Sequence, residues 1–107
     1  MKKAFLFLAP GFEEIEALAT VDILRRGGVD VKMISITDSR TVKGAHGIEV
    51  VADALYGDAE YSDAAALILP GGMPGATNLN DFDPLREQLL EQYRSGRIVA
   101  AICAAPL

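Results

Sequence analysis

The side chain with the clearest chemical potential is the single cysteine, Cys103, because a thiolate is intrinsically a strong nucleophile. It directly follows the apolar run 98–102 and precedes Ala104 and a second alanine. A buried strand that turns sharply into a helix exposes its next residue as a nucleophile, and the crowded turn requires small neighbours. The dipole of such a helix would lower the pKa of the thiol. Taken alone, a lone cysteine after a strand is more often buried and inert.

Acidic and glycine-rich segments follow two other buried strands. Glu13, Glu14 and Glu16 open a predicted helix, where acidic residues are favoured by the helix dipole alone. A carboxyl group in a partly apolar crevice can also stay protonated, donate to a thiolate and later move a proton, and Glu16 is our candidate. Gly71 and Gly72 follow the run 64–69. Their N–H groups can form an oxyanion hole, although an ordinary glycine-rich turn is the simpler interpretation.

The remaining composition excludes several classes of function. His46 is the only histidine and lies in a loop, where such a residue is more often a solvated surface side chain than a base. One cysteine and one distant histidine make no metal-ligand pattern, so we expect neither a metal nor a cofactor. The formal net charge of −5, without any basic run, argues against nucleic acid as a partner.

The location is also constrained by the sequence. No apolar run is long enough to cross a bilayer, so we expect no membrane partner. The apolar run 4–9 is followed at once by Pro-Gly and three glutamates rather than by a signal-peptide cleavage motif. A single cysteine is typical of a reducing compartment, and we expect a cytoplasmic protein.

Strands and helices alternate along the predicted chain. We expect strands at residues 3–9, 29–36, 48–52 (at an edge), 64–69 and 97–102, with helices at 13–26, from 83 to Gly96 and, in a short form, near 58–62. One face of the first helix carries Ile15, Leu18 and Ala19. The later helix is capped by Asp83, and its apolar stripe consists of Leu85, Leu89 and Tyr93. This alternation predicts one doubly wound α/β domain with a parallel sheet covered on both faces. Ligands in such sheets sit at the carboxyl ends of the strands, where segments 10–16, 70–75 and 103–106 should meet.

Four ordered motifs together resemble a known family. They are residues 9–16 (APGFEEIE), 21–28 (VDILRRGG), 69–72 (LPGG) and 100–106 (AAICAAP). They resemble successive motifs of the ThiJ/PfpI family, in its DJ-1-like and YajL-like branch, and the resemblance covers essentially the whole chain.

The resemblance implies a flavodoxin-like fold, of the kind shared with class I glutamine amidotransferases, and usually a homodimer. Its conserved cysteine falls on Cys103, its partner glutamate on Glu16, and its oxyanion amides on Gly71, Gly72 and Ala104. An arginine near Arg26 is expected at the dimer contact or the partner's pocket, and His46 at the pocket entrance.

The family resemblance also implies a function and a missing part. Its dimeric branch is associated with the conversion of α-oxoaldehydes such as methylglyoxal, as a glyoxalase without glutathione or a deglycase. A redox sensor or chaperone is the alternative, since low-pKa thiolates oxidise readily; a peptidase is disfavoured, because that branch has a histidine where Ala104 stands. Family members continue beyond the cysteine and carry a further site histidine there. We therefore expect residues 1–107 to be the N-terminal portion of one domain, completed by a continuation from Leu107 or by a second chain.

Overall fold

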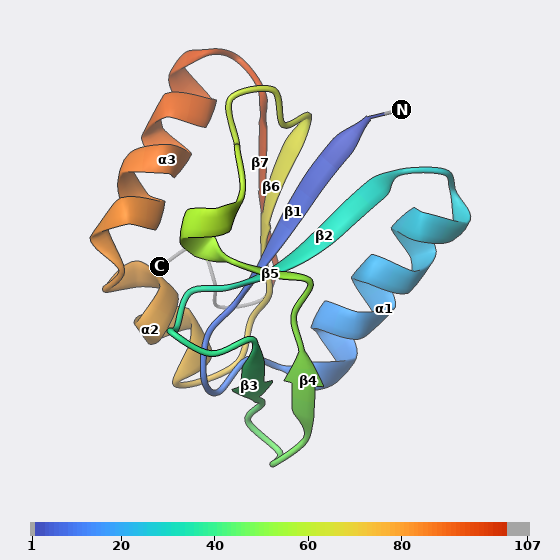
Figure 1. Cartoon of the computed structure of the whole chain (residues 1–107), viewed down its shortest axis with the longest axis vertical. Helices are drawn as coiled ribbons and strands as arrows, with labels where there is room; N and C mark the ends of the chain where they lie inside the picture. The colour runs from blue at the N-terminus through green and yellow to red at the C-terminus, as the bar shows by residue number, and fades with distance from the viewer. Residues whose placement is uncertain (1, 103–107) are drawn as a thin grey trace.

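A five-stranded, wholly parallel sheet forms the centre of the structure, a computed structural model that describes residues 2–102 (Figure 1). Its strands are β1 (Lys3–Leu8), β2 (Asp30–Ser35), β5 (Ala54–Leu55), β6 (Ala66–Leu69) and β7 (Ile98–Ala101). They lie side by side in the order β5-β2-β1-β6-β7, and every neighbouring pair is parallel. The predicted α/β class with a parallel sheet is confirmed.

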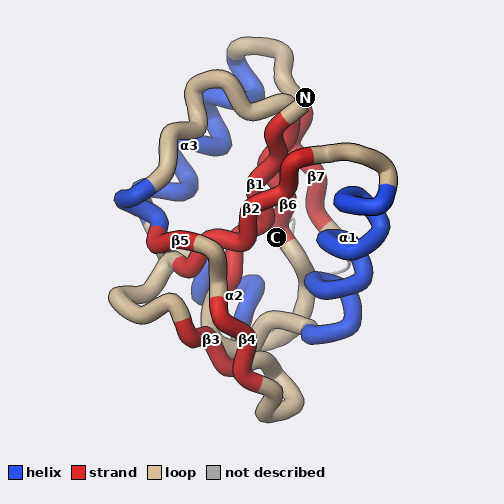
Figure 2. The backbone as a smooth tube through the Cα atoms, turned by 45° about the vertical axis from the view of Figure 1, so that its right-hand side comes forward, coloured by secondary structure: helices blue, strands red, loops and turns tan. Residues whose placement is uncertain are grey.

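Helices cover both faces of this sheet, with α1 (Glu14–Arg26) on one side and α2 (Gly75–Asn80) and α3 (Asp83–Arg94) on the other (Figures 1 and 2). The alternation of side chains along β1 explains the two layers. Leu6 and Leu8 pack in a cluster with α1, whereas Phe5 and Phe7 pack in the cluster that contains residues of α2 and α3. A strand buried on both faces must be apolar throughout, as residues 4–8 are.

Helix α1 begins one residue later than predicted and turns a different face to the sheet. The Glu13 side chain caps it by accepting a hydrogen bond from the Ile15 N–H at 2.7 Å. The expected apolar face was wrong as a core face: Ile15 is 78% exposed, and Leu18 and Ala19 are exposed too. The buried residues of α1 are Glu14, Ala17 and Val21 instead. Ala17 and Val21 pack in the cluster that contains Leu6 and Leu8 of β1.

Helix α3 differs from its prediction in the opposite direction and begins one residue early. Phe82 is its N-cap and Asp83 is already helical, so the prediction of Asp83 as the cap was one residue late. Leu85 is fully buried as expected, but Tyr93 is 77% exposed. Gln92 takes the buried position because its Nε2 donates to backbone carbonyls at the start of β6 and β7, those of Ala64 (3.0 Å) and Ile98 (3.2 Å).

The strand predicted at 48–52 is present, but it belongs to a separate hairpin and not to an edge of the main sheet. The hairpin consists of β3 (Thr41–Lys43) and β4 (Glu49–Val51), which are antiparallel and form their own two-stranded sheet. On the β2 side, the edge strand of the main sheet is β5. The short helix expected near 58–62 is a single 3₁₀ turn, η1 (Tyr56–Asp58). Helix α2 was not predicted, because its sequence GATNLN has little helical propensity. Within residues 2–102, no helix is long and apolar enough to cross a membrane.

Strand β7 is the outermost strand, on the side opposite β5, of the sheet formed by residues 2–102. Ile98 is 61% and Val99 39% exposed, unlike the buried residues of β1 and β6. Within this described part of the chain, β7 is paired on one side only, which leaves these side chains less covered than those of a central parallel strand.

Candidate functional site

The candidate site lies where the order of the strands reverses. After β1 the chain adds β2 on one side, and the later strands β6 and β7 lie on the other side. At such a switch point the loops after two neighbouring strands diverge and leave a crevice at their carboxyl ends. Here the two loops follow β1 and β6, and they carry the motifs that the sequence analysis singled out.

Glu16 and the glycine-rich loop meet at this crevice. The Gly71 N–H donates a hydrogen bond to Glu16 Oε1 at 3.1 Å, and the Glu13 N–H donates to the Gly71 carbonyl at 2.9 Å. The first turn of α1 is therefore fixed to the loop after β6 by two hydrogen bonds in opposite directions. Glu16 Oε1 is thus held by a backbone donor of the glycine-rich loop.

The described part of the chain stops one residue before the cysteine, so the Cys103 and Ala104 predictions lie outside it. The Ile102 N–H donates to the Leu69 carbonyl at 3.0 Å. Leu69 directly precedes the loop that contains Gly71, so residue 102 is hydrogen-bonded to the start of this loop. Strand β7 therefore ends at the same end of the sheet that holds Glu16.

Three glycines let the two loops approach closely. Gly72, at φ +101°, lies so near the α1 entry that an added Cβ would stand 2.5 Å from the Glu13 backbone nitrogen. A Cβ on Gly11 would meet Pro74, and one on Gly75 would meet the backbone of Gly11 and its neighbour at 2.7–2.8 Å. The glycines of the motifs therefore serve close backbone packing, whatever part their N–H groups have in chemistry.

Glu14 is a buried carboxylate whose partners the sequence pattern did not predict. Its side chain is 3% exposed. Its Oε2 accepts from the N–H groups of His46 (2.8 Å) and Ile48 (3.2 Å), and its Oε1 lies 2.8 Å from His46 Nδ1. Gly44 makes room for the carboxylate, since a Cβ there would lie 2.4 Å from Glu14 Cδ. Glu14 thus ties the β3–β4 hairpin to the start of α1.

These contacts move the protonation equilibria of both partners. Burial raises the pKa of Glu14, but hydrogen bonds from the His46 side chain and from backbone N–H groups outweigh burial and lower the pKa to about 2. The hydrogen bond to Glu14 and its negative charge raise the pKa of His46 above its usual value, with a smaller contribution from Glu13. His46 is thus exposed, as expected of a loop histidine, yet engaged with two carboxylates.

Arg26 is not near the crevice within one chain. It lies in the last turn of α1, ten residues or about 15 Å along the helix from Glu16. Its guanidinium pairs with Asp22 at 3.1 Å on the exposed surface. A role at another protomer's pocket remains a prediction.

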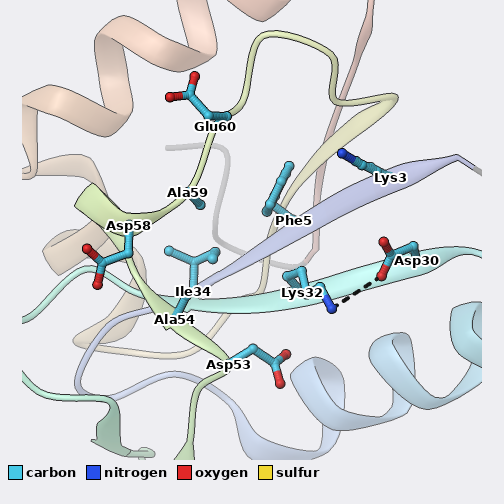
Figure 3. Close-up of a pocket in the computed structure, with 10 residues that line it drawn as sticks. All are labelled: Lys3, Phe5, Asp30, Lys32, Ile34, Asp53, Ala54, Asp58, Ala59 and Glu60. Atoms are coloured by element: carbon cyan, nitrogen blue, oxygen red, sulfur yellow. Dashed lines mark ion pairs between the residues drawn. The ribbon is translucent and has the colours of Figure 1, made fainter.

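A further hollow of about 470 Å³ lies elsewhere, towards the amino-terminal halves of β1 and β2 (Figure 3). Phe5 and Ile34 form its apolar floor, and charged side chains surround them, among them the Lys32–Asp30 ion pair at 3.5 Å. Ligands of doubly wound sheets bind at the other ends of the strands, so this hollow is not the candidate site.

The strand order and the bond between Glu16 and Gly71 define the class of protein, a flavodoxin-like α/β domain with a glutamate and a glycine-rich loop joined at the switch point. The model of the DJ-1/PfpI family matches residues 2–107, and the chain belongs to that family. Protein DJ-1 homolog B of Arabidopsis thaliana is 42% identical over 105 residues, which are 98% of this chain and 24% of the relative. The glutathione-independent glyoxalase DJR-1.2 of Caenorhabditis elegans is 37% identical over 106 residues, 98% of this chain and 56% of the relative.

Solved structures agree with this assignment. Oxidized DJ-1 of Toxoplasma gondii superposes with a TM-score of 0.95 at 37% identity, covering 99% of this chain and 58% of that one. DJ-1beta of Drosophila melanogaster gives a TM-score of 0.94 at 31% identity, with 98% and 56% covered. The chain thus spans between about a quarter and somewhat over half the length of these relatives. The predicted family and its flavodoxin-like fold are confirmed.

Proposed function

We propose that the protein converts reactive α-oxoaldehydes such as methylglyoxal by thiolate addition at Cys103, as a glyoxalase-like or deglycase-like enzyme independent of glutathione. The hydrogen bond between Gly71 and Glu16 carries the proposal, because it holds a carboxyl group at the sheet end that leads into the cysteine. The Caenorhabditis elegans relative with a glyoxalase name supports the same reaction class.

The chemistry assigns a role to each group. The Cys103 thiolate adds to the aldehyde carbon, and the carbonyl electron pair moves to oxygen to give a hemithioacetal oxyanion. The N–H groups of Gly72 and Ala104 stabilise this oxyanion, while the Gly71 N–H, the third predicted donor, holds Glu16 beside it. Glu16 protonates the oxyanion and, as a carboxylate, then removes the C1 proton and delivers it to C2, while the hydroxyl proton on the C1 oxygen moves to the C2 oxygen. This shift gives a lactoyl thioester, and water hydrolyses it to lactate and regenerates the thiolate.

The completed site needs more polypeptide than residues 2–102. Strand β7 is unpaired on its outer side in this part of the chain, and the apolar residues Ile15, Ile23 and Ile102 border a hollow of about 380 Å³ next to it. We propose that further polypeptide of the same family domain covers this region and supplies the third catalytic residue, a histidine. A homodimer in the cytoplasm, with Arg26 or His46 near the contact or pocket, completes the proposal.

A redox sensor or chaperone based on Cys103 oxidation is the second candidate. The structural relative from Toxoplasma gondii, which is described as oxidized, favours it. A Glu16 carboxyl group can donate a hydrogen bond to a sulfinate as well as to a thiolate.

Steady-state kinetics on the intact protein separates the two. An enzyme produces lactate from methylglyoxal over many turnovers without glutathione, and Cys103→Ser abolishes this production. Less than one lactate per protein, together with stoichiometric oxidation of Cys103 by peroxide in a mass spectrum, would establish the sensor and overturn the enzyme.

A further inference from the structure

Three potential metal ligands meet where the β3–β4 hairpin touches the start of α1. Glu13, Glu14 and His46 each offer one ligand atom, and these atoms all lie within 4.8 Å of one another. This group lies within residues 2–102. No ligand spacing in the sequence predicts it, because His46 is 32 positions from Glu14. No residue of the group is assigned to the thiol chemistry above.

Backbone hydrogen bonds already orient both carboxylates for coordination. Glu13 Oε1 accepts from the Ile15 N–H at 2.7 Å, and Glu14 Oε2 accepts from two N–H groups of the hairpin. The second oxygen of each carboxylate faces the imidazole: Glu14 Oε1 lies 2.8 Å and Glu13 Oε2 3.5 Å from His46 Nδ1. Metal-binding carboxylates are commonly held in this way through the oxygen that does not coordinate.

The distances suit a small ion. Two ligand atoms about 2.1 Å from a tetrahedral ion lie about 3.4 Å apart. The Glu13–His46 separation of 3.5 Å matches that spacing, and the Glu14–His46 separation of 2.8 Å needs to open by about 0.6 Å. The His46 side chain is 67% exposed, so its ring can make this movement while Glu14 stays fixed.

The surroundings leave room for ligands from solvent. The same three residues line a cavity of about 240 Å³ together with Ile15 and Ile48. An ion held by three protein atoms keeps a coordination position for water, and this cavity gives that position access.

We propose that Glu13 Oε2, Glu14 Oε1 and His46 Nδ1 bind one divalent transition-metal ion of the zinc class. One imidazole nitrogen with two carboxylates favours this class over calcium and magnesium, which prefer oxygen ligands alone. In the metal-free protein, a proton on Nδ1 takes the place of the ion between the imidazole and the carboxylates.

Zinc titration of the intact protein tests the proposal. The Cys103 thiol is itself a zinc ligand, so all variants carry Cys103→Ser and are treated with a chelator before calorimetry with ZnCl₂. We expect one zinc per chain, with affinity reduced at least about tenfold by His46→Gln and by Glu13→Gln, since even outer-sphere partners change metal affinity about 10–100-fold. Glu49→Gln removes one negative charge from an exposed position of the same hairpin and should leave the affinity unchanged.

Nitrogen NMR of the imidazole gives a second readout. Zinc should shift the Nδ1 resonance of His46, assigned by its absence in His46→Gln, because Nδ1 exchanges a proton for the ion. The proposal is overturned if the Cys103→Ser protein takes up no zinc. It is equally overturned if both His46→Gln and Glu13→Gln retain the parent affinity, which would show that the ion binds elsewhere.

Discussion

Gly75→Ala tests whether close contact between the loops after β1 and β6 positions the site. A Cβ at Gly75 would lie 2.7 Å from the Phe12 nitrogen and 2.8 Å from both C and O of Gly11, whereas ordinary contacts begin at 3.4 Å. The loops must separate by about 0.7 Å (3.4 − 2.7), because backbone atoms cannot swing aside as a side chain does. The displaced segment leads directly into α1 and Glu16.

The expected loss of stability follows from two opposing effects. Overpacking against fixed atoms costs about 3 kcal/mol, at the upper end of its usual range, and replacing a helical glycine by alanine returns up to about 1 kcal/mol. We expect a net loss of about 2 kcal/mol in the free energy of unfolding, or a fall of about 1 M in the urea midpoint.

The matched control is Gly57→Ala, since a Cβ on Gly57 would have nothing within 4 Å. Urea denaturation of the intact protein measures stability, and the rate of Cys103 alkylation by iodoacetamide measures the site. We expect Gly57→Ala to change neither, and Gly75→Ala to lower the alkylation rate severalfold. A Gly75→Ala protein within 0.5 kcal/mol of wild type, a margin usual for surface substitutions, would refute the close-packing argument.

Four further outcomes are expected. Because the pKa of Glu14 falls from 4.5 to about 2 on folding, its stabilising effect should be complete above about pH 4.5 and lost as the pH falls towards 2; urea midpoints in chelator should show this acid loss, and Glu14→Gln should flatten it. Cys103 alkylation should have a midpoint pH below about 8.5, the value of a free thiol, and a midpoint at or above it would contradict an activated thiolate. Glu16→Gln should lose methylglyoxal turnover while holding the Gly71 hydrogen bond better than Glu16→Ala, and full activity of Glu16→Gln would remove Glu16 from proton transfer. Residues 1–107 expressed alone should associate or bind a hydrophobic dye through the exposed Ile98, and a monodisperse monomer with a normal cooperative melt would disprove the need for further polypeptide.

Local pattern and motif were enough to predict the sheet, the sites of its main strands and the family. Residues 4–9 and 64–69 are short continuous apolar runs ended by Pro-Gly, as expected of strands buried on both faces of a parallel sheet. Parallel strands end at one edge, so the pairing of Glu16 with the loop at Gly71 could be expected before the structure was known.

Tertiary packing decided what the sequence left open. The apolar pattern of α1 allows either Ile15 or Ala17 to face the core, and only the rotation of the helix on the sheet buries Ala17 and leaves Ile15 exposed. The partnership of Glu14 with His46 depends on a hairpin that folds back over 32 residues, and no spacing rule connects them. The sequence therefore determined which groups lie at the ends of strands. Only the folded chain determined that Glu14 faces the imidazole of His46 and that Glu16 joins the glycine-rich loop at Gly71. These pairings depend on long-range distances of a few ångströms, which the sequence does not contain.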